Sequence, residues 1–176
     1  IAEHDGHTLN PSTSKTVACA SDIDGATIDV AVFAESAADI AQEAAKIDGI
    51  ARVLTVENSA NANALAAVLA PQVAEIAASY SHVFGPSTTF GKDLMPRVAA
   101  LLGVNQISDV MGVQGSHTFQ RPIYAGNVVL TVQAPEGHPV VATVRTASYK
   151  SVGTSNSAAV EPASCSAELP THTRYI

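Results

Sequence analysis

The segment Thr27–Val56, TIDVAVFAESAADIAQEAAKIDGIARVLTV, decides the fold because its hydrophobic period changes from strand to helix and back. Apolar residues alternate along Thr27–Phe33, which predicts a strand. A capping-box-like start at Ser36 and a stop at Gly49 bracket a helical repeat of apolar residues. Arg52–Val56 predicts a second strand. A strand, a helix and a strand in this order predict two parallel strands joined by a right-handed crossover.

The same alternation of strands and helices continues on both sides of this segment. Pro71 lies inside the longest predicted helix, so we expect a kink there or two abutting helices. Pro96 is tolerated only in a first turn, so the helix that contains it should begin near Asp93. The remaining predicted elements are the end of a strand whose start is missing at Ile1-Ala2, helices over Pro11–Ala20, Asn63–Tyr80 and Asp93–Leu102, and strands over His82–Gly85 and Val104–Val110.

The pattern changes after Val110, where three strands follow without helices between them. We expect an α/β fold: a three-layer parallel sheet with helices on both faces, plus an antiparallel strand extension at the sheet edge. From about Ser151 the composition shifts to Ser, Ala, Pro and Thr. This shift predicts one domain over residues 1–150 and a linker or loosely docked tail over residues 151–176. The three strands of the extension are Thr118–Tyr124, Val128–Gln133 and Val140–Val144.

Composition and charge limit the classes of function. The 176 residues are 47% hydrophobic and 14% charged, with a mean hydropathy of +0.19, which is too apolar for a disordered chain. So little charge favours a large buried sheet or a surface that meets a partner. Acidic residues number 16 and basic residues 9, and the net charge of −7 argues against nucleic acid or an anionic membrane as the main partner. No apolar stretch reaches the ~18 residues that a membrane span needs.

The two cysteines and the start of the chain bear on the compartment. Cys19 and Cys165 lie far apart and fit no C-x-x-C pattern, so free thiols of a reducing compartment are favoured over a disulfide. No signal peptide is recognisable. The chain opens at Ile1 without a methionine, which indicates trimming or processing at the front and leaves an upstream signal open.

Two segments contain residue types that bind anions or metals. Gly85–Asp93, GPSTTFGKD, joins a predicted strand to a predicted helix, where backbone N–H groups and the helix dipole favour an anion. Its glycine spacing differs from that of a phosphate loop and Asp93 would repel phosphate, so a plain turn is favoured over non-catalytic nucleotide binding. Glu3–His7, EHDGH, could hold a metal through His-x-x-His and two acids, but a solvated polar loop is the favoured interpretation.

No nucleophilic or dinucleotide-binding site stands out in the sequence. Ser87 lacks the G-x-S-x-G context because Thr89 occupies the last position. Gly112–Gly115 is only G-x-x-G. His82, at the start of a predicted strand, is better explained as a hydrogen-bonded structural residue than as a catalytic base. We therefore assign no catalytic and no metal-ligating residue.

The segment Arg121–Asn127, RPIYAGN, is a candidate contact surface. Pro122 cannot donate to a strand ladder and indicates an edge or a bulge. Arg121 and Tyr124 are large side chains that can hydrogen-bond, as interface residues often do, and Asn127 completes a tight turn. A purely local structural role is the alternative. The candidate inter-domain or inter-subunit contacts are Arg121, Tyr124 and Asn127.

Several motifs resemble the α subunits of electron transfer flavoproteins. RPIYAGN at Arg121–Asn127 resembles a signature of that family. FGKDLMPRVAALL at Phe90–Leu102, followed by QISD at Gln106–Asp109, resembles its central segment. The motifs agree in order and spacing over about residues 1–150. The further matches are IAEH at Ile1–His4, AAKIDGI at Ala44–Ile50 and VRTAS at Val144–Ser148.

The resemblance implies an electron-carrier subunit of two domains. The first is a parallel α/β domain of the adenine-nucleotide α-hydrolase-like kind, and a linker leads to a second domain that holds most of the FAD contacts. Motifs of that second domain do not occur here, so no FAD-contacting residue is carried over and no cofactor is expected on this span. In the family's heterodimer, FAD lies between the second domain and a β subunit, which also buries AMP in many members.

The resemblance also implies partners and a compartment. The family's flavin collects electrons from dehydrogenases such as acyl-CoA dehydrogenases and passes them to a membrane quinone oxidoreductase. The first domain is a platform that packs on the β subunit, in the bacterial cytoplasm or the mitochondrial matrix. The alternatives are a free-standing nucleotide-binding module resembling universal stress proteins, which would use the Gly85–Lys92 loop, and a small hydrolase with a serine nucleophile.

Overall fold

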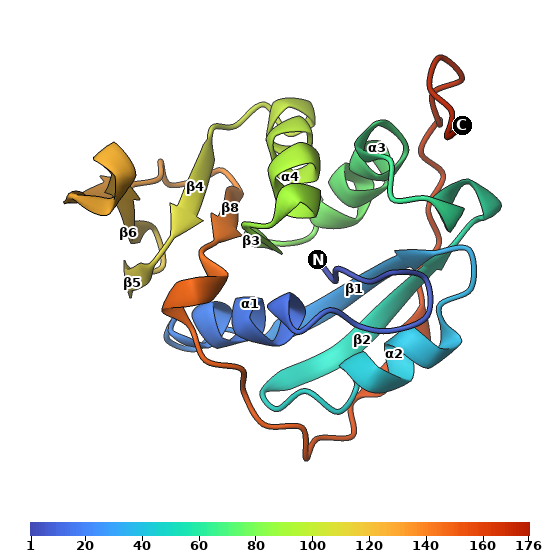
Figure 1. The fold of residues 1–176 in the computed structure, drawn as a ribbon, viewed down its shortest axis with the longest axis horizontal. Coiled ribbons are helices and arrows are strands. Elements are labelled where there is room, and N and C mark those ends of the chain that lie inside the picture. The colour runs from blue at the N-terminus through green and yellow to red at the C-terminus, as the bar shows by residue number, and fades with distance from the viewer.

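The computed structural model describes residues 1–176 as parallel strands with helices on both faces and a small antiparallel sheet to one side (Figure 1). This arrangement confirms the predicted α/β class. The parallel strands, however, form two sheets of three strands instead of one continuous sheet.

The first parallel sheet has the strand order β1-β2-β9. β1 (Ile28–Ala34) and β2 (Ile50–Glu57) are the two strands of the β-α-β segment, and α2 (Ala38–Ala44) connects them. β9 (Ala159–Pro162) pairs in parallel with β2 at the outer edge. These four residues lie in the segment expected to be a linker or a loosely docked tail, and they form a strand without an apolar period because backbone pairing holds an edge strand.

The chain on either side of β9 is held by polar contacts to the same body. The carboxylate of Asp48 accepts hydrogen bonds from the N–H and the hydroxyl of Ser155, each at 2.9 Å. The Asn156 amide donates to a backbone carbonyl on each side of the turn before β2, at 3.0 Å. After β9, the Ser166 N–H donates to the Glu75 carboxylate at 2.8 Å. The segment is therefore docked over most of its length.

The second parallel sheet has the order β3-β8-β4. β3 (His82–Pro86) and β4 (Gln106–Val110) flank β8 (Val140–Val144), which is parallel to both. The sequence predicts β8 in the antiparallel extension, and this is wrong. All five residues of β8 are buried, as is typical of a central parallel strand. After the hairpin, β8 begins at the same end of the sheet as β3 and β4 and therefore runs parallel to them. The local sequence of β8 does not determine this direction.

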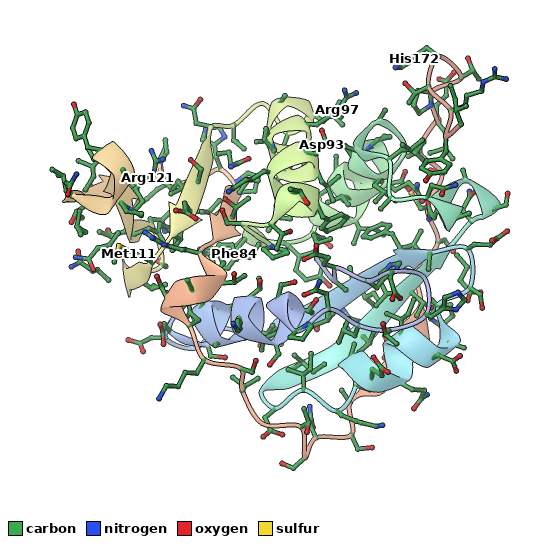
Figure 2. The ribbon with its side chains drawn as sticks, in the orientation of Figure 1. Phe84, Asp93, Arg97, Met111, Arg121 and His172 are labelled. Atoms are coloured by element: carbon green, nitrogen blue, oxygen red, sulfur yellow. The ribbon has the colours of Figure 1, made fainter.

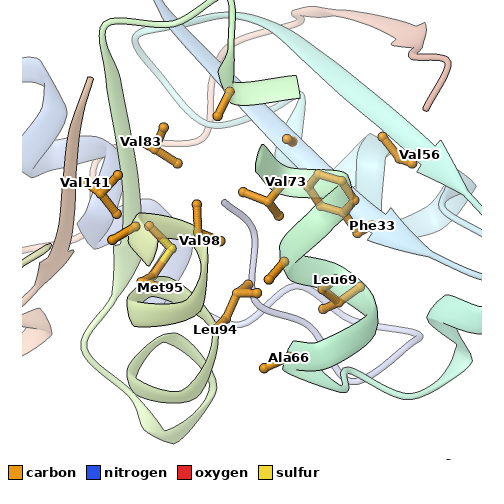
Figure 3. Close-up of a cluster of buried hydrophobic side chains, with 14 of the residues drawn as sticks. Phe33, Val56, Ala66, Leu69, Val73, Val83, Leu94, Met95, Val98 and Val141 are labelled. Carbon is orange, nitrogen blue, oxygen red and sulfur yellow. The ribbon is translucent and has the colours of Figure 1, made fainter. Parts of the chain in front are cut away.

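Alternate residues of the strands face two different helical layers. α3 (Ala66–Ala77) and α4 (Thr89–Leu101) cover one face, and α1 (Ser12–Ser21) and α2 cover the other (Figure 1). Figure 3 shows the cluster on the α3–α4 side, which takes side chains from both parallel sheets and so joins them. Its buried members include Phe33, Val56, Val83 and Val141 from the strands and Leu69, Val73, Leu94, Met95 and Val98 from the helices.

Two helices begin at different residues from those predicted. α4 begins at Thr89 and not near Asp93, because the Thr88 hydroxyl accepts the Gly91 N–H at 3.4 Å and caps the helix earlier. Pro96 consequently lies inside the helix. α2 receives no cap from the predicted serine. Instead, the N–H of Ala37, the residue before the helix, donates to the carboxylate of Glu57 at the end of β2, at 2.7 Å.

The α3 region also differs in detail from the prediction. One helix runs through Pro71, and a short 3₁₀ helix, η1 (Ser59–Ala62), precedes it. The buried amides of Asn61 and Gln72 bond reciprocally, at 2.7 and 3.1 Å, and connect the two elements. This pair satisfies polar groups that would otherwise be costly in the core.

The antiparallel sheet consists of β5 (Gly112–Gly115), β6 (Thr118–Ile123) and β7 (Val128–Gln133), in that order. The β6–β7 pairing confirms the predicted hairpin. Phe119 anchors the hairpin because it is fully buried, and its ring meets the ring of Phe84 edge-on at a centroid distance of 6.0 Å.

The cysteines and the first residues have defined places. Cys19 and Cys165 are both free thiols, and burial raises the pKa of Cys19 to about 12. Ile1 and Ala2 lie between the two parallel sheets: the Ala2 N–H donates to the Ala31 carbonyl of β1, at 2.9 Å, and the Ile1 nitrogen donates to the Phe84 carbonyl of β3, at 2.6 Å. They carry the hydrogen bonds of a strand end without forming a strand.

Candidate functional site

An apolar edge strand projects from the body of the molecule. We call the hairpin from Thr118 to Gln133, which contains β6 and β7, the arm. β7 is the last strand of its sheet and no strand pairs with its outer edge. Val128, Val129 and Leu130 are 43%, 50% and 40% exposed. An uncharged apolar edge strand offers free backbone groups to another chain, so natural proteins normally cover or charge it.

The turn at the tip of the arm is strained. Tyr124 and Ala125 have φ values of 50° and 55°, and Gly126 follows with 93°. Left-handed backbone is unfavourable for residues other than glycine, and each such residue costs on the order of 1–3 kcal/mol. Asn127 stabilises the turn, since its backbone and side-chain N–H groups both donate to the Tyr124 carbonyl. The turn holds Tyr124 outward with 75% of its surface exposed.

Arg121 has a different role from the tip residues. Its Nε donates to the backbone carbonyl of Ser108 at 2.8 Å, and its Nη2 contacts the Ser108 hydroxyl at 2.9 Å. These bonds connect β6 to β4, and Figure 2 shows Arg121 at this junction. The residue after it, Pro122, lies where β6 extends beyond its pairing with β5. Of the three predicted contact residues, only Tyr124 therefore has its side chain free for a partner.

The predicted anion loop closes on itself. The Ser87 N–H donates to the carbonyl of Val144 at 2.7 Å, and the Gly91 N–H is taken by Thr88. The carbonyl oxygen of Pro86 lies directly against Gly91, only 1.8 Å from where a Cβ on that glycine would be. The oxygen beside Gly91 and the engaged N–H groups of Ser87 and Gly91 favour the plain-turn interpretation of Gly85–Asp93.

The Glu3–His7 loop uses its polar atoms internally. His4 Nε2 lies 3.0 Å from the Phe33 carbonyl, and Nδ1 of the same ring accepts the Gly6 N–H at 3.1 Å. Asp5 accepts hydrogen bonds from Thr8 and from the His7 N–H, and these bonds lower its pKa to about 2. The structure has no group of three or more His, Cys, Asp or Glu side chains that could hold a metal ion.

His82 is hydrogen-bonded at both ring nitrogens. Nε2 lies 2.6 Å from the Ser116 carbonyl and Nδ1 lies 2.9 Å from the Ser81 hydroxyl. Its ring also packs edge-on against Phe84. These contacts match the predicted structural role.

A cavity that sequence reasoning missed separates β1 from β3. It has a volume of about 540 Å³, and 15 of its 25 lining residues are hydrophobic. Asp29 lies on its wall with a carboxylate that is 8% exposed; Arg52 Nε and the Tyr80 hydroxyl both donate to Oδ2, while Oδ1 is buried without a partner. No local sequence motif indicates such a cavity, because its walls come from five elements that are distant in sequence: α1, β1, β2, α3 and β3.

Comparison with known proteins shows that the sequence is similar to members of one family. The electron transfer flavoprotein domain model matches residues 1–170. The chain is 46% identical over 165 residues to the electron transfer flavoprotein subunit alpha of Pseudomonas aeruginosa, covering 93% of this chain and 53% of that protein. It is 37% identical to the mitochondrial subunit alpha of Dictyostelium discoideum, covering 90% and 46% respectively. It is 40% identical to the subunit alpha of Paracoccus denitrificans, covering 89% and 50%. The chain thus spans about half the length of these relatives.

Proposed function

The chain belongs to the electron transfer flavoprotein family, as an α-subunit sequence, and from this membership we propose that it forms the platform domain of an electron-carrier heterodimer. In the complete protein the carrier would hold FAD, collect electrons from dehydrogenases such as acyl-CoA dehydrogenases and deliver them to a membrane quinone oxidoreductase. The β subunit is the proposed docking partner and the proposed site of AMP. The compartment would be the cytoplasm of a bacterium or the mitochondrial matrix of a eukaryote.

The exposed apolar edge of the arm is the observation that carries the docking proposal. Three consecutive apolar residues of β7 and the outward Tyr124 face solvent on a strand with a free edge. Tyrosine is one of the residue types that contribute most of the binding energy at protein interfaces, and covering the three aliphatic side chains would remove apolar surface from water. The buried Phe119 and the Arg121–Ser108 bonds fix the arm to the body, so docking would meet a pre-formed surface.

The division into domains is part of the same proposal. Residues 1–150 would form the platform, and residues 151–176 would lead toward a FAD-binding domain. Within this span the tail is already docked through β9 and the Ser166–Glu75 bond. None of the helices combines the length and the apolar character of a membrane span. The closed Gly85–Asp93 loop gives no support to the alternative of a free-standing nucleotide-binding module.

Binding to a purified family β subunit tests the docking proposal. Leu130→Lys on β7 should weaken binding at least about tenfold, because a charge enters the apolar contact. Leu101→Lys is the matched control, since Leu101 is 55% exposed on α4 and lies away from the arm. Sedimentation velocity or titration calorimetry gives the dissociation constants, with circular dichroism to check folding. Equal affinity of the two variants would refute docking through the arm.

A flavin titration tests the proposed division of labour. The chain alone should retain no FAD after gel filtration, so its absorbance near the flavin bands should return to baseline. Stoichiometric flavin retained by residues 1–176 would place the cofactor site within this span and contradict the platform assignment.

A further inference from the structure

The strand that leads from the body toward the arm contains a β-bulge. The register of β4 against β8 shifts between Ile107 and Val110. Within this shift, two residues of β4, Ser108 and Asp109, stand against one residue of β8, Thr143. A bulge of this kind bends its strand and redirects the side chains beside it. Figure 1 shows β4 between β8 and the antiparallel sheet that contains the arm, so the bend occurs where the chain leaves the body.

A buried hydroxyl holds the bulge in one conformation. Asp109 has a φ of 61°, in the left-handed region, which aspartate tolerates better than most residues. Its N–H donates to the Thr143 hydroxyl at 2.9 Å, and Thr143 is fully buried. The Asp109 carboxylate lies 4.0 Å from Nε of Arg145, but both side chains are at least 33% exposed, so this ion pair adds little. The backbone conformation, held by Thr143, therefore fixes the bulge.

Arg121 connects the bulge to the apolar edge of the arm. β4 is the last strand of its parallel sheet, and the Ser108 carbonyl accepts a hydrogen bond from Nε of Arg121. A second bond joins Nη2 to the Ser108 hydroxyl, so the planar guanidinium is held at two points. Within the arm, Arg121 of β6 pairs in register with Leu130 of β7. The position of Ser108 is thus passed through one side chain and one strand pair to an exposed residue of the edge.

Two attachments on one face of β6 define the direction of the arm. Phe119 and Arg121 share this face, because alternate residues of a strand point to the same side. Phe119 is fully buried against the ring of Phe84, but a hydrophobic contact has little directionality. The hydrogen bonds from Arg121 to Ser108 supply the directional contact. The orientation of β7 consequently depends on where the bulge places Ser108.

We propose that the Ser108-Asp109 bulge is the positioning element of the docking surface: it sets the orientation of the arm, and Arg121 transmits this orientation to the apolar edge of β7. The inference rests on the docking proposed for the arm. It assigns Asp109, Thr143 and Arg121 as positioning residues, which act on β-subunit binding through the arm. A surface held in its bound orientation binds more tightly than a mobile one, because less conformational entropy is lost on association.

Nuclear magnetic resonance of the chain alone tests the first step. Residual dipolar couplings of the β6 and β7 amides should fit the same alignment tensor as those of the body. Asp109→Val should reduce the arm couplings at least about twofold, because a β-branched residue strongly disfavours a left-handed φ. Thr143→Val, which keeps the shape but loses the hydroxyl, and Arg121→Gln should do the same. Asp109→Asn should keep the original couplings, since asparagine tolerates this backbone and only the charge is lost.

Affinity for a purified family β subunit tests the second step. Asp109→Val and Arg121→Gln should each weaken binding at least about fivefold, whereas Asp109→Asn should stay within about twofold of the unmodified chain. Gln72→Leu breaks the buried amide pair between η1 and α3, outside the arm, and controls for a loss of stability alone. It should leave both the couplings and the affinity unchanged.

The two measurements separate failure of this inference from failure of the proposed docking. An arm that stays aligned with the body in Asp109→Val and in Arg121→Gln would overturn the inference. An Asp109→Asn variant as mobile as Asp109→Val would also overturn it, because the charge and not the backbone would then position the arm. A mobile arm with unchanged affinity would refute docking through the arm, while the positioning of the arm by the bulge would stand.

Discussion

Replacing Gly91 with alanine should destabilise the protein through a single backbone contact. A Cβ on this residue would lie 1.8 Å from the Pro86 carbonyl oxygen, whereas real Cβ contacts stay beyond 3.0 Å. The two groups must therefore separate by at least 1.2 Å, the difference between these distances. The obstacle is a backbone oxygen at the end of β3, so no side-chain rotation can relieve it.

The size of the effect follows from two opposing contributions. Overpacking in a close-packed interior costs about 1–3 kcal/mol and sometimes more. Alanine in a helix gains roughly 1 kcal/mol over glycine. Because the required shift moves both β3 and the first turn of α4, we place the net loss in the free energy of unfolding at about 2–3 kcal/mol. A domain of this size should then lose roughly 4–12 °C in melting temperature.

Urea denaturation followed by circular dichroism measures this loss, with Gly115→Ala as the control. At Gly115 a Cβ would meet no atom within 4 Å, and the backbone has no left-handed φ, so this substitution should change the unfolding free energy by less than about 0.5 kcal/mol. If Gly91→Ala were as stable as Gly115→Ala, α4 would not lie as close to β3 as the structure places it. The contact between Gly91 and the Pro86 carbonyl, which favours a plain turn, would then be refuted as well.

Three other substitutions or conditions have defined outcomes. Because burial holds the Ile1 ammonium at a pKa of about 6 against ~8 in the unfolded chain, the unfolded state binds the proton more tightly. The free energy of unfolding should therefore rise by roughly 2–3 kcal/mol as the pH increases through 6 to 8, and N-terminal acetylation should remove this part of the urea-measured pH dependence. Gln72→Leu should cost about 1–3 kcal/mol by leaving the buried Asn61 amide short of a partner, and a double variant with Asn61→Leu should recover part of it; additive losses in calorimetry would contradict the pairing. Phe119→Ala should cost about 3–5 kcal/mol and speed proteolysis within the arm, and unchanged cleavage would show that the ring does not anchor it.

Hydrophobic period alone predicted most helices and strands, but it did not predict how β8 and β9 pair. The apolar repeats of β8 and α2 predicted both elements. They did not predict the direction of β8, because that direction depends on where the chain re-enters the sheet after the hairpin and not on the residues of β8. β9 escaped prediction because its exposed residues show no apolar alternation, and only backbone bonds to β2 define it.

The candidate surface was predictable as a segment but not as individual contacts. The proline and the turn residues of RPIYAGN drew attention to the β6–β7 hairpin as a candidate contact surface, and this remains a prediction. The sequence could not show that the Arg121 side chain donates hydrogen bonds to Ser108 while the Tyr124 side chain stays exposed. Both are large side chains with polar groups, and they lie only three residues apart. The apolar residues of β7 predicted a strand but not its position in the sheet. Only the strand order shows that β7 lies at the edge with no partner on its outer side.

The amino-acid sequence by itself determined the α/β class, the family and the order of the elements, since all three are written in local periods and motifs. Tertiary structure alone decided that Gly91 packs against the Pro86 carbonyl, that the outer edge of β7 has no partner strand and that a cavity separates β1 from β3. Each of these features depends on groups brought together from distant parts of the chain. Such contacts arise from packing and backbone pairing, which no local pattern of side chains records.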